Sequence, residues 1–161
     1  MKQLEKGILH ALMSLVLLLS LTVTSSAQED PAYQKAIKEI EQEFGTVPVM
    51  FEVFPKYALA GAWENFKQLS SPESKIPPKY RELLQLAVAA QIPCQYCIYF
   101  HTAAAKAFGA TEEEIQEAVA QGAQTRHWSM ILQGNQINFE TFKKEFDTMM
   151  KYMAENAAKK K

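Results

Sequence analysis

The sequence predicts an all-α domain of six or seven helices, on three observations. No stretch shows the alternation of apolar and polar residues, with a period of two, that a half-buried β-strand needs. Nearly every segment instead repeats its apolar residues at helical spacing. Prolines, glycines and capping residues fall between those segments, where they begin and end helices. At 161 residues, the chain is long enough for one ordinary domain.

The N-terminus has the pattern of a secretory signal peptide. Two lysines precede an apolar run over residues 8–23, and small residues follow it up to Ala27. The alternative is a retained membrane anchor, but the run contains two serines and is shorter than the roughly 20 apolar residues of a spanning helix. We therefore expect a signal peptide at 1–27, cleavage after Ala27, and an all-α domain at 28–161. The mature protein would be periplasmic or extracellular, with no stable membrane span.

The charge balance argues against nucleic acid as a partner. Removing residues 1–27 leaves 15 basic and 17 acidic residues, a net charge of −2. Binding to phosphate backbones needs a concentrated basic surface, and the mature chain has no such excess. Export also implies an oxidising compartment, in which the two cysteines of the chain can form a disulfide.

The first half of the mature chain predicts three helices. Asp30 can cap a helix over Pro31–Phe44, and Gly45 ends it. An aromatic segment interrupted by prolines then predicts a short helix over 49–54 and a longer one over 56–69. The apolar stripe of the first helix is formed by Tyr33, Ala36, Ile37, Ile40 and Phe44.

The middle of the chain predicts two helices that follow its clearest loop, residues 70–78. The helix over Pro78–Gln91 has apolar residues almost all round, so we expect it to be largely buried. The next helix begins near Cys94, just after a proline, and continues to Phe108. Gly109 then ends it.

Two more helices complete the chain. Thr111 and Glu114 have the form of a capping box, which predicts a helix that continues to about Gln133. Asn138 can cap the last helix. The apolar face of that helix is formed by Phe139, Phe142, Phe146, Met149 and Met153, a pattern more typical of packing than of ligand binding.

The two cysteines and a histidine lie on one face of a predicted helix. Because a helix turns about 100° per residue, Cys94, Cys97 and His101 fall within about 60° of one another. Cys94 is at the helix N-terminus, where free backbone N–H groups favour a thiolate. His101 can take a proton from Cys97 or stabilise its anion. This arrangement favours a redox centre.

Two other interpretations of these residues stay open, and so does the environment of Glu82. A bridge across a four-residue loop adds little stability, which weakens but does not exclude an inert disulfide. A zinc site could use the two cysteines, the histidine and a carboxylate as a tetrahedral set, although zinc sites more often take their second ligand pair from another Cys/His cluster, and none is present. Glu82, on the preceding helix, is either a buried proton shuttle or an exposed acid beside Lys79 or Arg81.

Taken together, these motifs resemble a known family. Glu82, Cys94-Gln95-Tyr96-Cys97 and His101, on consecutive helices, resemble the AhpD-like alkylhydroperoxidases of the carboxymuconolactone decarboxylase superfamily. The resemblance covers roughly residues 47–134 and includes the Gly109-Ala110-Thr111 turn and the helix after it. It implies an all-α fold, assembly into trimers or hexamers, and peroxidase or disulfide-reductase chemistry. The decarboxylase branch generally lacks the cysteine pair, so lactone decarboxylation is not expected.

The resemblance also implies roles for individual residues. Cys97 would be the thiolate that attacks peroxide, Cys94 the resolving thiol, and Glu82 with His101 the proton relay. The helix-terminus argument instead favours Cys94 as the more acidic sulfur. The best-known members of the family place a histidine directly before the second cysteine, where this chain has Tyr96, a weaker proton carrier near neutral pH. Tyr96 and His127 are candidates for supporting contacts around the site.

The sequence therefore predicts an exported, thiol-dependent peroxidase, an antioxidant enzyme of peroxiredoxin type. It would act on hydroperoxides, be reset by an external thiol reductant, and need no cofactor or metal beyond the Cys94–Cys97 disulfide. One alternative is a thiol–disulfide oxidoreductase for exported partners. Another is a non-catalytic oligomeric binding module with a structural disulfide. The support for that module is the aromatic supply at Phe51, Phe54, Tyr57, Trp63 and Phe66, which core packing also explains.

Overall fold

The computed structural model describes residues 30–159, so the expected signal peptide at 1–27 lies outside the described residues. The described chain forms seven helices and no strands, as the sequence predicts. It divides after Ser71 into two compact units, residues 30–71 and 72–159, and the division falls in the predicted loop. Each unit is described below by itself.

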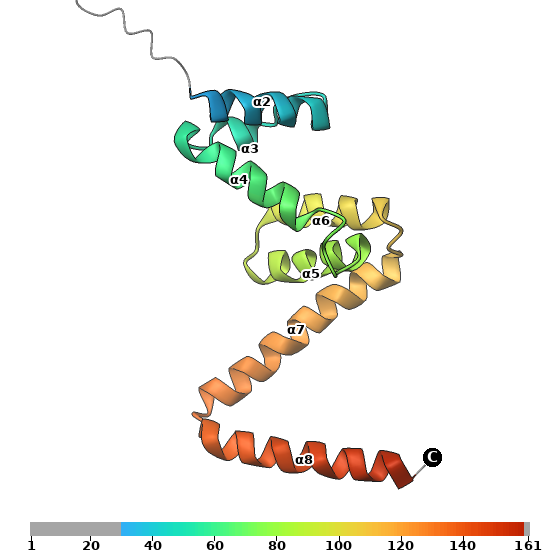
Figure 1. The fold of residues 1–161 in the computed structure, drawn as a ribbon. Coiled ribbons are helices and arrows are strands. Elements are labelled where there is room, and N and C mark those ends of the chain that lie inside the picture. The colour runs from blue at the N-terminus through green and yellow to red at the C-terminus, as the bar shows by residue number, and fades with distance from the viewer. Residues whose placement is uncertain (1–29, 160–161) are drawn as a thin grey trace, which may run out of the picture. The chain divides into compact units, whose positions relative to one another are not determined.

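The first unit consists of α2 (Pro31–Phe44), α3 (Val49–Glu52) and α4 (Lys56–Leu69) (Figure 1). The side chain of Asp30 accepts a hydrogen bond from the backbone N–H of Ala32, and it caps α2 as predicted. Gly45 ends the helix with φ of 72°, a left-handed conformation that a glycine adopts without steric cost. The short helix α3 stops two residues earlier than predicted.

The core of this unit lies where α2, α3 and α4 meet. Trp63 of α4 is buried, and its indole Nε1 donates a hydrogen bond of 2.9 Å to Glu39 of α2. Lys67 donates to the same carboxylate at 2.7 Å, so two hydrogen bonds to Glu39 join α2 and α4 beside their apolar contact. Of the aromatic residues singled out in the sequence, Phe51 is also buried, whereas Tyr57 is 86% exposed. The fully or nearly buried residues are Ala36, Ile40, Phe51, Leu59 and Trp63.

The second unit consists of α5 (Pro78–Gln91), α6 (Gln95–Ala107), α7 (Glu112–Gly134) and α8 (Phe139–Lys159). Helix α5 packs against both α6 and α7, and Figure 1 shows α5 and α6 side by side. The short connection between α5 and α6 makes them an antiparallel helical hairpin, so the start of α5 lies beside the end of α6. The buried apolar residues that join these helices are Leu83, Leu86, Ala105 and Ile115.

The start of α7 is fixed by polar contacts as well as by packing. Thr111 and Glu114 form the predicted capping box, in which each side chain accepts from the other residue's backbone N–H. Lys79 at the start of α5 donates a hydrogen bond of 2.7 Å to Glu114. This bond holds the pKa of the Glu114 carboxyl below its ordinary value and raises the pKa of Lys79. The N-termini of α5 and α7 are thereby tied together.

The prediction that α5 is largely buried is wrong for one side of the helix. Leu84 is 55% exposed and Val88 is 60% exposed. These two residues lie one helical turn apart, on a side that neither α6 nor α7 covers. Apolar residues all round a helix allow every side to be buried, but a side is buried only where another helix packs against it.

Helix α8 buries none of its residues. Its predicted cap is present, because the side chain of Asn138 accepts from the backbone N–H of Thr141 at 2.9 Å. The predicted apolar face is mostly exposed, including Phe139, Phe146 and Met149. Over residues 30–159, none of the helices combines the length and the apolar character that a membrane crossing requires.

Candidate active site

The cysteine pair lies at the N-terminus of α6, as predicted. Cys94 is the capping residue of the helix, and a disulfide joins it to Cys97, with 5.3 Å between the two Cα atoms. The Sγ atom of Cys94 accepts a hydrogen bond of 3.2 Å from the backbone N–H of Cys97. Both cysteines are half-buried, so the disulfide is within reach of solvent. A redox pair needs this combination of a helix N-terminus and access.

Glu82 and His101 meet in the α5–α6 hairpin. Glu82 Oε2 lies 2.9 Å from His101 Nδ1, and Glu82 is 7% exposed. Of the two expectations for Glu82, the structure favours the buried one, since its exposed alternative required a solvated first turn. His101 lies one helical turn beyond Cys97 on α6, and its ring contacts Phe100 edge-on at 5.2 Å. The hairpin therefore places a carboxylate of α5 against an imidazole of α6, the helix that begins at the disulfide.

Arg81 is a neighbour of this pair that the sequence did not assign to the site. Its Nε lies 3.6 Å from Glu82 Oε1, and only 14% of its side-chain surface is exposed. The sequence offered Arg81 as a neighbour of Glu82 only in the exposed alternative, because consecutive residues on a helix point about 100° apart and the pattern does not predict that their charged ends meet when little of either side chain is exposed. The sequence feature that could have indicated this contact is the position of Arg81 and Glu82 next to each other at the edge of a long stretch without charged residues.

That uncharged stretch surrounds the disulfide. Between Glu82 and Lys106 the sequence has no Asp, Glu, Lys or Arg, and His101 is its one titratable residue besides the cysteines and two tyrosines. Within the described residues, no group of three or more His, Cys, Asp and Glu side chains is arranged to hold a metal ion. The reactive groups that the site presents are the two cysteines, the imidazole of His101 and the carboxylate of Glu82.

The two candidates for supporting contacts lie apart from the Glu82–His101 pair. Tyr96, between the cysteines, is 79% exposed, and within the described chain it makes no recorded hydrogen bond. His127 is exposed on α7, and its ring contacts Trp128 edge-on at 5.4 Å. Within residues 30–159, no hydrogen bond or ring contact joins the side chain of either residue to the cysteines, Glu82 or His101. Their roles stay predictions.

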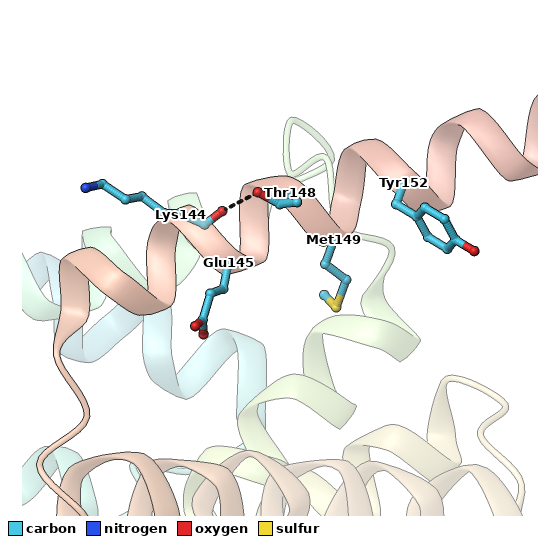
Figure 2. A pocket seen from close by; sticks show the side chains of 5 residues that line it. All are labelled: Lys144, Glu145, Thr148, Met149 and Tyr152. Atoms are coloured by element: carbon cyan, nitrogen blue, oxygen red, sulfur yellow. Dashed lines mark hydrogen bonds between the residues drawn. The ribbon is translucent and has the colours of Figure 1, made fainter.

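A hollow elsewhere on the surface is not part of this site. Its lining residues all come from α8, and Figure 2 shows them along that single helix, with the Thr148 hydroxyl bonded to the Lys144 carbonyl. A hollow lined by one helix lacks the second wall that a ligand pocket needs. The lining residues are Lys144, Glu145, Thr148, Met149 and Tyr152.

The fold and the site together define an all-α protein with a Cys-x-x-Cys disulfide at a helix N-terminus and a carboxylate–imidazole pair behind it. The model of the carboxymuconolactone decarboxylase family matches residues 57–136, which include α5, α6 and α7 in full. An uncharacterised protein of Cupriavidus necator is 29% identical over 84 residues, which are 52% of this chain and 70% of that protein.

A solved structure agrees with the family model. The crystal structure of an alkylhydroperoxidase AhpD core from Rhodospirillum rubrum matches with a TM-score of 0.59 and 26% identity, over 76% of this chain and 93% of that one. The chain belongs to the carboxymuconolactone decarboxylase superfamily as an AhpD-like member, which confirms the predicted family. Membership associates the chain with oxidoreductase chemistry of the peroxidase type.

Proposed function

We propose that this protein is an exported, thiol-dependent peroxidase that reduces hydroperoxides through Cys94 and Cys97. The observation that carries the proposal is the placement of the cysteine pair and the Glu82–His101 hydrogen bond on one helical hairpin. Similarity to an alkylhydroperoxidase core supports the same chemistry. The signal-peptide pattern over residues 1–27 supports export.

The reaction begins from the reduced, dithiol form of the protein. The Cys97 thiolate attacks the outer oxygen of the peroxide, the O–O bond breaks, and the products are a Cys97 sulfenic acid and an alkoxide that takes up a proton. The Cys94 thiol then attacks the sulfenic sulfur, which releases water and forms the disulfide. An external dithiol supplies two electrons and two protons to restore both thiols.

Glu82 and His101 would manage the protons in these steps. As a carboxylate, Glu82 accepts a hydrogen bond from His101 Nδ1–H, which leaves Nε2 of the ring as a base. That base takes the proton from the Cys97 thiol, and the imidazolium then gives it to the departing alkoxide. We assign the attack to Cys97 because His101 lies one turn from it, and resolution to Cys94.

The capping hydrogen bond of Cys94 favours a second candidate function. A thiolate at the N-terminus of α6 would accept the Cys97 N–H more strongly than a disulfide sulfur does. Stabilising the reduced form makes a dithiol pair more oxidising, as thiol–disulfide exchange with exported partners requires. The reduction potential separates the two functions, because an oxidising value favours disulfide donation and a reducing value favours peroxide reduction.

We also propose that the chain assembles into a homo-oligomer, a trimer or a hexamer, through the exposed face of α8. Half-exposed aromatic and methionine side chains each offer roughly 100 Å² of apolar surface. The exposed apolar residues of α8 thus supply a large part of the roughly 800 Å² per partner of a stable interface. The charged residues of α8 number four acidic and four basic, so a second copy meets no net repulsion.

Thiol counting on the purified protein tests the peroxidase. Reduced protein treated with a hydroperoxide should lose two free thiols without a lasting mixed adduct, and Cys97→Ser should lose turnover with a thiol donor present. Cys94→Ser should still form a sulfenic acid, which a dimedone-type reagent captures. Full activity of Cys97→Ser would refute the assignment. Cysteines that cycle with neither peroxide nor any thiol donor would favour the non-catalytic binding module.

A further inference from the structure

We infer that the exposed aromatic face of α6, formed by Tyr96, Tyr99 and Phe100 beside the disulfide, is a docking surface for a polypeptide thiol. The partner that fits it presents its cysteine in an uncharged, apolar segment. The inference rests on the proposed function and deepens it, because a disulfide that turns over has to be reset by an external thiol.

The aromatic face lies where that thiol has to arrive. In thiol–disulfide exchange the attacking sulfur must reach one sulfur of the pair, so the partner contacts the residues around the disulfide. Phe100 lies one helical turn beyond Cys97, and Tyr96 lies one turn before Phe100. Tyr96 is 79% exposed, Tyr99 is 81% exposed and Phe100 is 46% exposed. The opposite side of α6 packs on the core through Ala105.

The segment that carries the disulfide offers nothing to attract a charged partner. Residues 83–105 contain no Asp, Glu, Lys or Arg. Glu82, which precedes this segment, is 7% exposed and presents little surface to a partner. Lys106, which follows it, pairs with Glu112 and lies about 18 Å along the helix axis from Cys94. Covering an aromatic surface with an unpaired charge is costly, so the matching segment is uncharged.

Exposure and area favour a protein that binds briefly over a small ligand or a second copy of the chain. Small ligands are held in concave sites that enclose most of their surface, whereas Tyr96 and Tyr99 stand out from the helix. At roughly 200 Å² for a whole aromatic side chain, the exposed parts of the aromatic face amount to on the order of 400 Å². That is about half of the 800 Å² per partner of a stable complex, and it lies in the range of transient redox encounters.

Thiol exchange with model peptides tests the inference on the oxidised protein, without peroxide. Each peptide carries one cysteine, flanked by valine and phenylalanine, by glutamates or by lysines. A peptide thiolate attacks one sulfur of the Cys94–Cys97 bond, which forms a mixed disulfide and frees the other cysteine as a thiolate. A second peptide thiolate then releases the peptide disulfide and the reduced protein, so two peptide thiols supply the two electrons. Each rate is divided by the rate of the same peptide with hydroxyethyl disulfide, which cancels differences in thiol acidity.

The corrected rate of the apolar peptide should exceed those of both charged peptides at least tenfold. The double variant Tyr96→Ser/Tyr99→Ser should lower it to the rates of the charged peptides, because most of the aromatic face is then lost. Phe100 is left in place, since its ring contacts His101. Tyr57→Ser, at a tyrosine of α4 that is 86% exposed, is the matched control and should keep the preference. If the double variant does not fold, Tyr99→Ser alone should reduce the preference.

The outcomes separate this inference from the peroxidase. Equal corrected rates for the three peptides, or a faster charged peptide, overturn the docking surface. A preference that survives in the folded variants overturns it as well, and so does exchange that slows as the protein concentration rises, because a second copy then covers the face. A preference for the apolar peptide in a protein that does not consume peroxide supports the docking surface and refutes the peroxidase. Peroxide consumption with dithiothreitol, without any peptide preference, refutes the docking surface alone.

Discussion

Replacement of Glu82 by glutamine tests the proton relay most directly. Glu82→Gln keeps the size and shape of the side chain but removes the negative charge that accepts the His101 Nδ1–H bond. A hydrogen bond to a charged group contributes about 1.5–3 kcal/mol. Since about 1.4 kcal/mol corresponds to a factor of ten in rate, we expect peroxide reduction to slow roughly 10- to 100-fold.

The assay isolates the step in which the base acts. Protein is reduced, freed of reductant and mixed with hydroperoxide, and the loss of free thiols is followed to give a second-order rate constant. Glu117→Gln, at an exposed glutamate of α7, controls for the loss of one negative charge. Thermal unfolding of both variants is recorded, because the neutral amide also removes the negative charge that lies 3.6 Å from Arg81 Nε. A folded Glu82→Gln protein that reacts within threefold of the wild type would show that the carboxylate has no part in activating the thiol.

Three further predictions concern stability and assembly. Gly61→Ala should stabilise the protein by about 0.5–1 kcal/mol in urea denaturation, because Gly61 lies inside α4 with open space around it. The hydrogen bond from Lys79 lowers the pKa of the Glu114 carboxyl, so its stabilising effect is present above the ordinary value of 4.5 and disappears as the pH falls through the lowered value. Acid denaturation of Glu114→Gln should therefore depend less on pH below 4.5. Phe146→Lys should dissociate the oligomer in size-exclusion chromatography with light scattering.

Matched variants give these predictions their controls. Gly122→Ala should not stabilise the protein as Gly61→Ala does. The added Cβ would lie 3.4 Å from both the Cβ and the carbonyl oxygen of Ala87. Asp147→Lys adds charge to α8 beside Phe146 and away from the apolar face, so it should leave assembly intact. A monomeric wild type, or equal dissociation by both α8 variants, would contradict the proposed interface. An unchanged acid profile in Glu114→Gln would contradict the role of Lys79.

The helices could be predicted from local sequence because their ends carry local signals. The bounds of α2, α4 and α5 follow from prolines at or just before the first turn and, for α2, from Asp30 and Gly45, whose effects extend over only a few residues. The capping box of α7 is equally local. For these elements, caps and apolar spacing contain most of the information needed.

The site could be predicted only in part, because its decisive contacts join residues far apart in the chain. The spacing of Cys94, Cys97 and His101 is a property of one helix and follows from the sequence. The contact between Glu82 and His101 spans 19 positions, and periodicity leaves the burial of Glu82 undecided. The position of Arg81 depends on how its side chain bends toward its neighbour, and the exposure of Leu84 depends on which helices are absent beside α5.

The role of Cys94 as the cap of α6 links the redox state of the cysteine pair to the stability of the fold. In the disulfide form, the Sγ atom that accepts the Cys97 N–H is a weak acceptor, and in the reduced form the same atom can be an anion facing the positive end of the helix. Reduction therefore removes the covalent cross-link and, in its place, strengthens the electrostatic interaction of the Cys94 sulfur with the N-terminus of α6. The disulfide and dithiol forms, folded and unfolded, make a thermodynamic cycle. In that cycle, the difference in unfolding free energy between the two forms corresponds, through ΔG = −nFΔE with two electrons, to the difference in reduction potential between the folded and the unfolded chain. A pair of melting curves would thus report the same quantity as a redox titration.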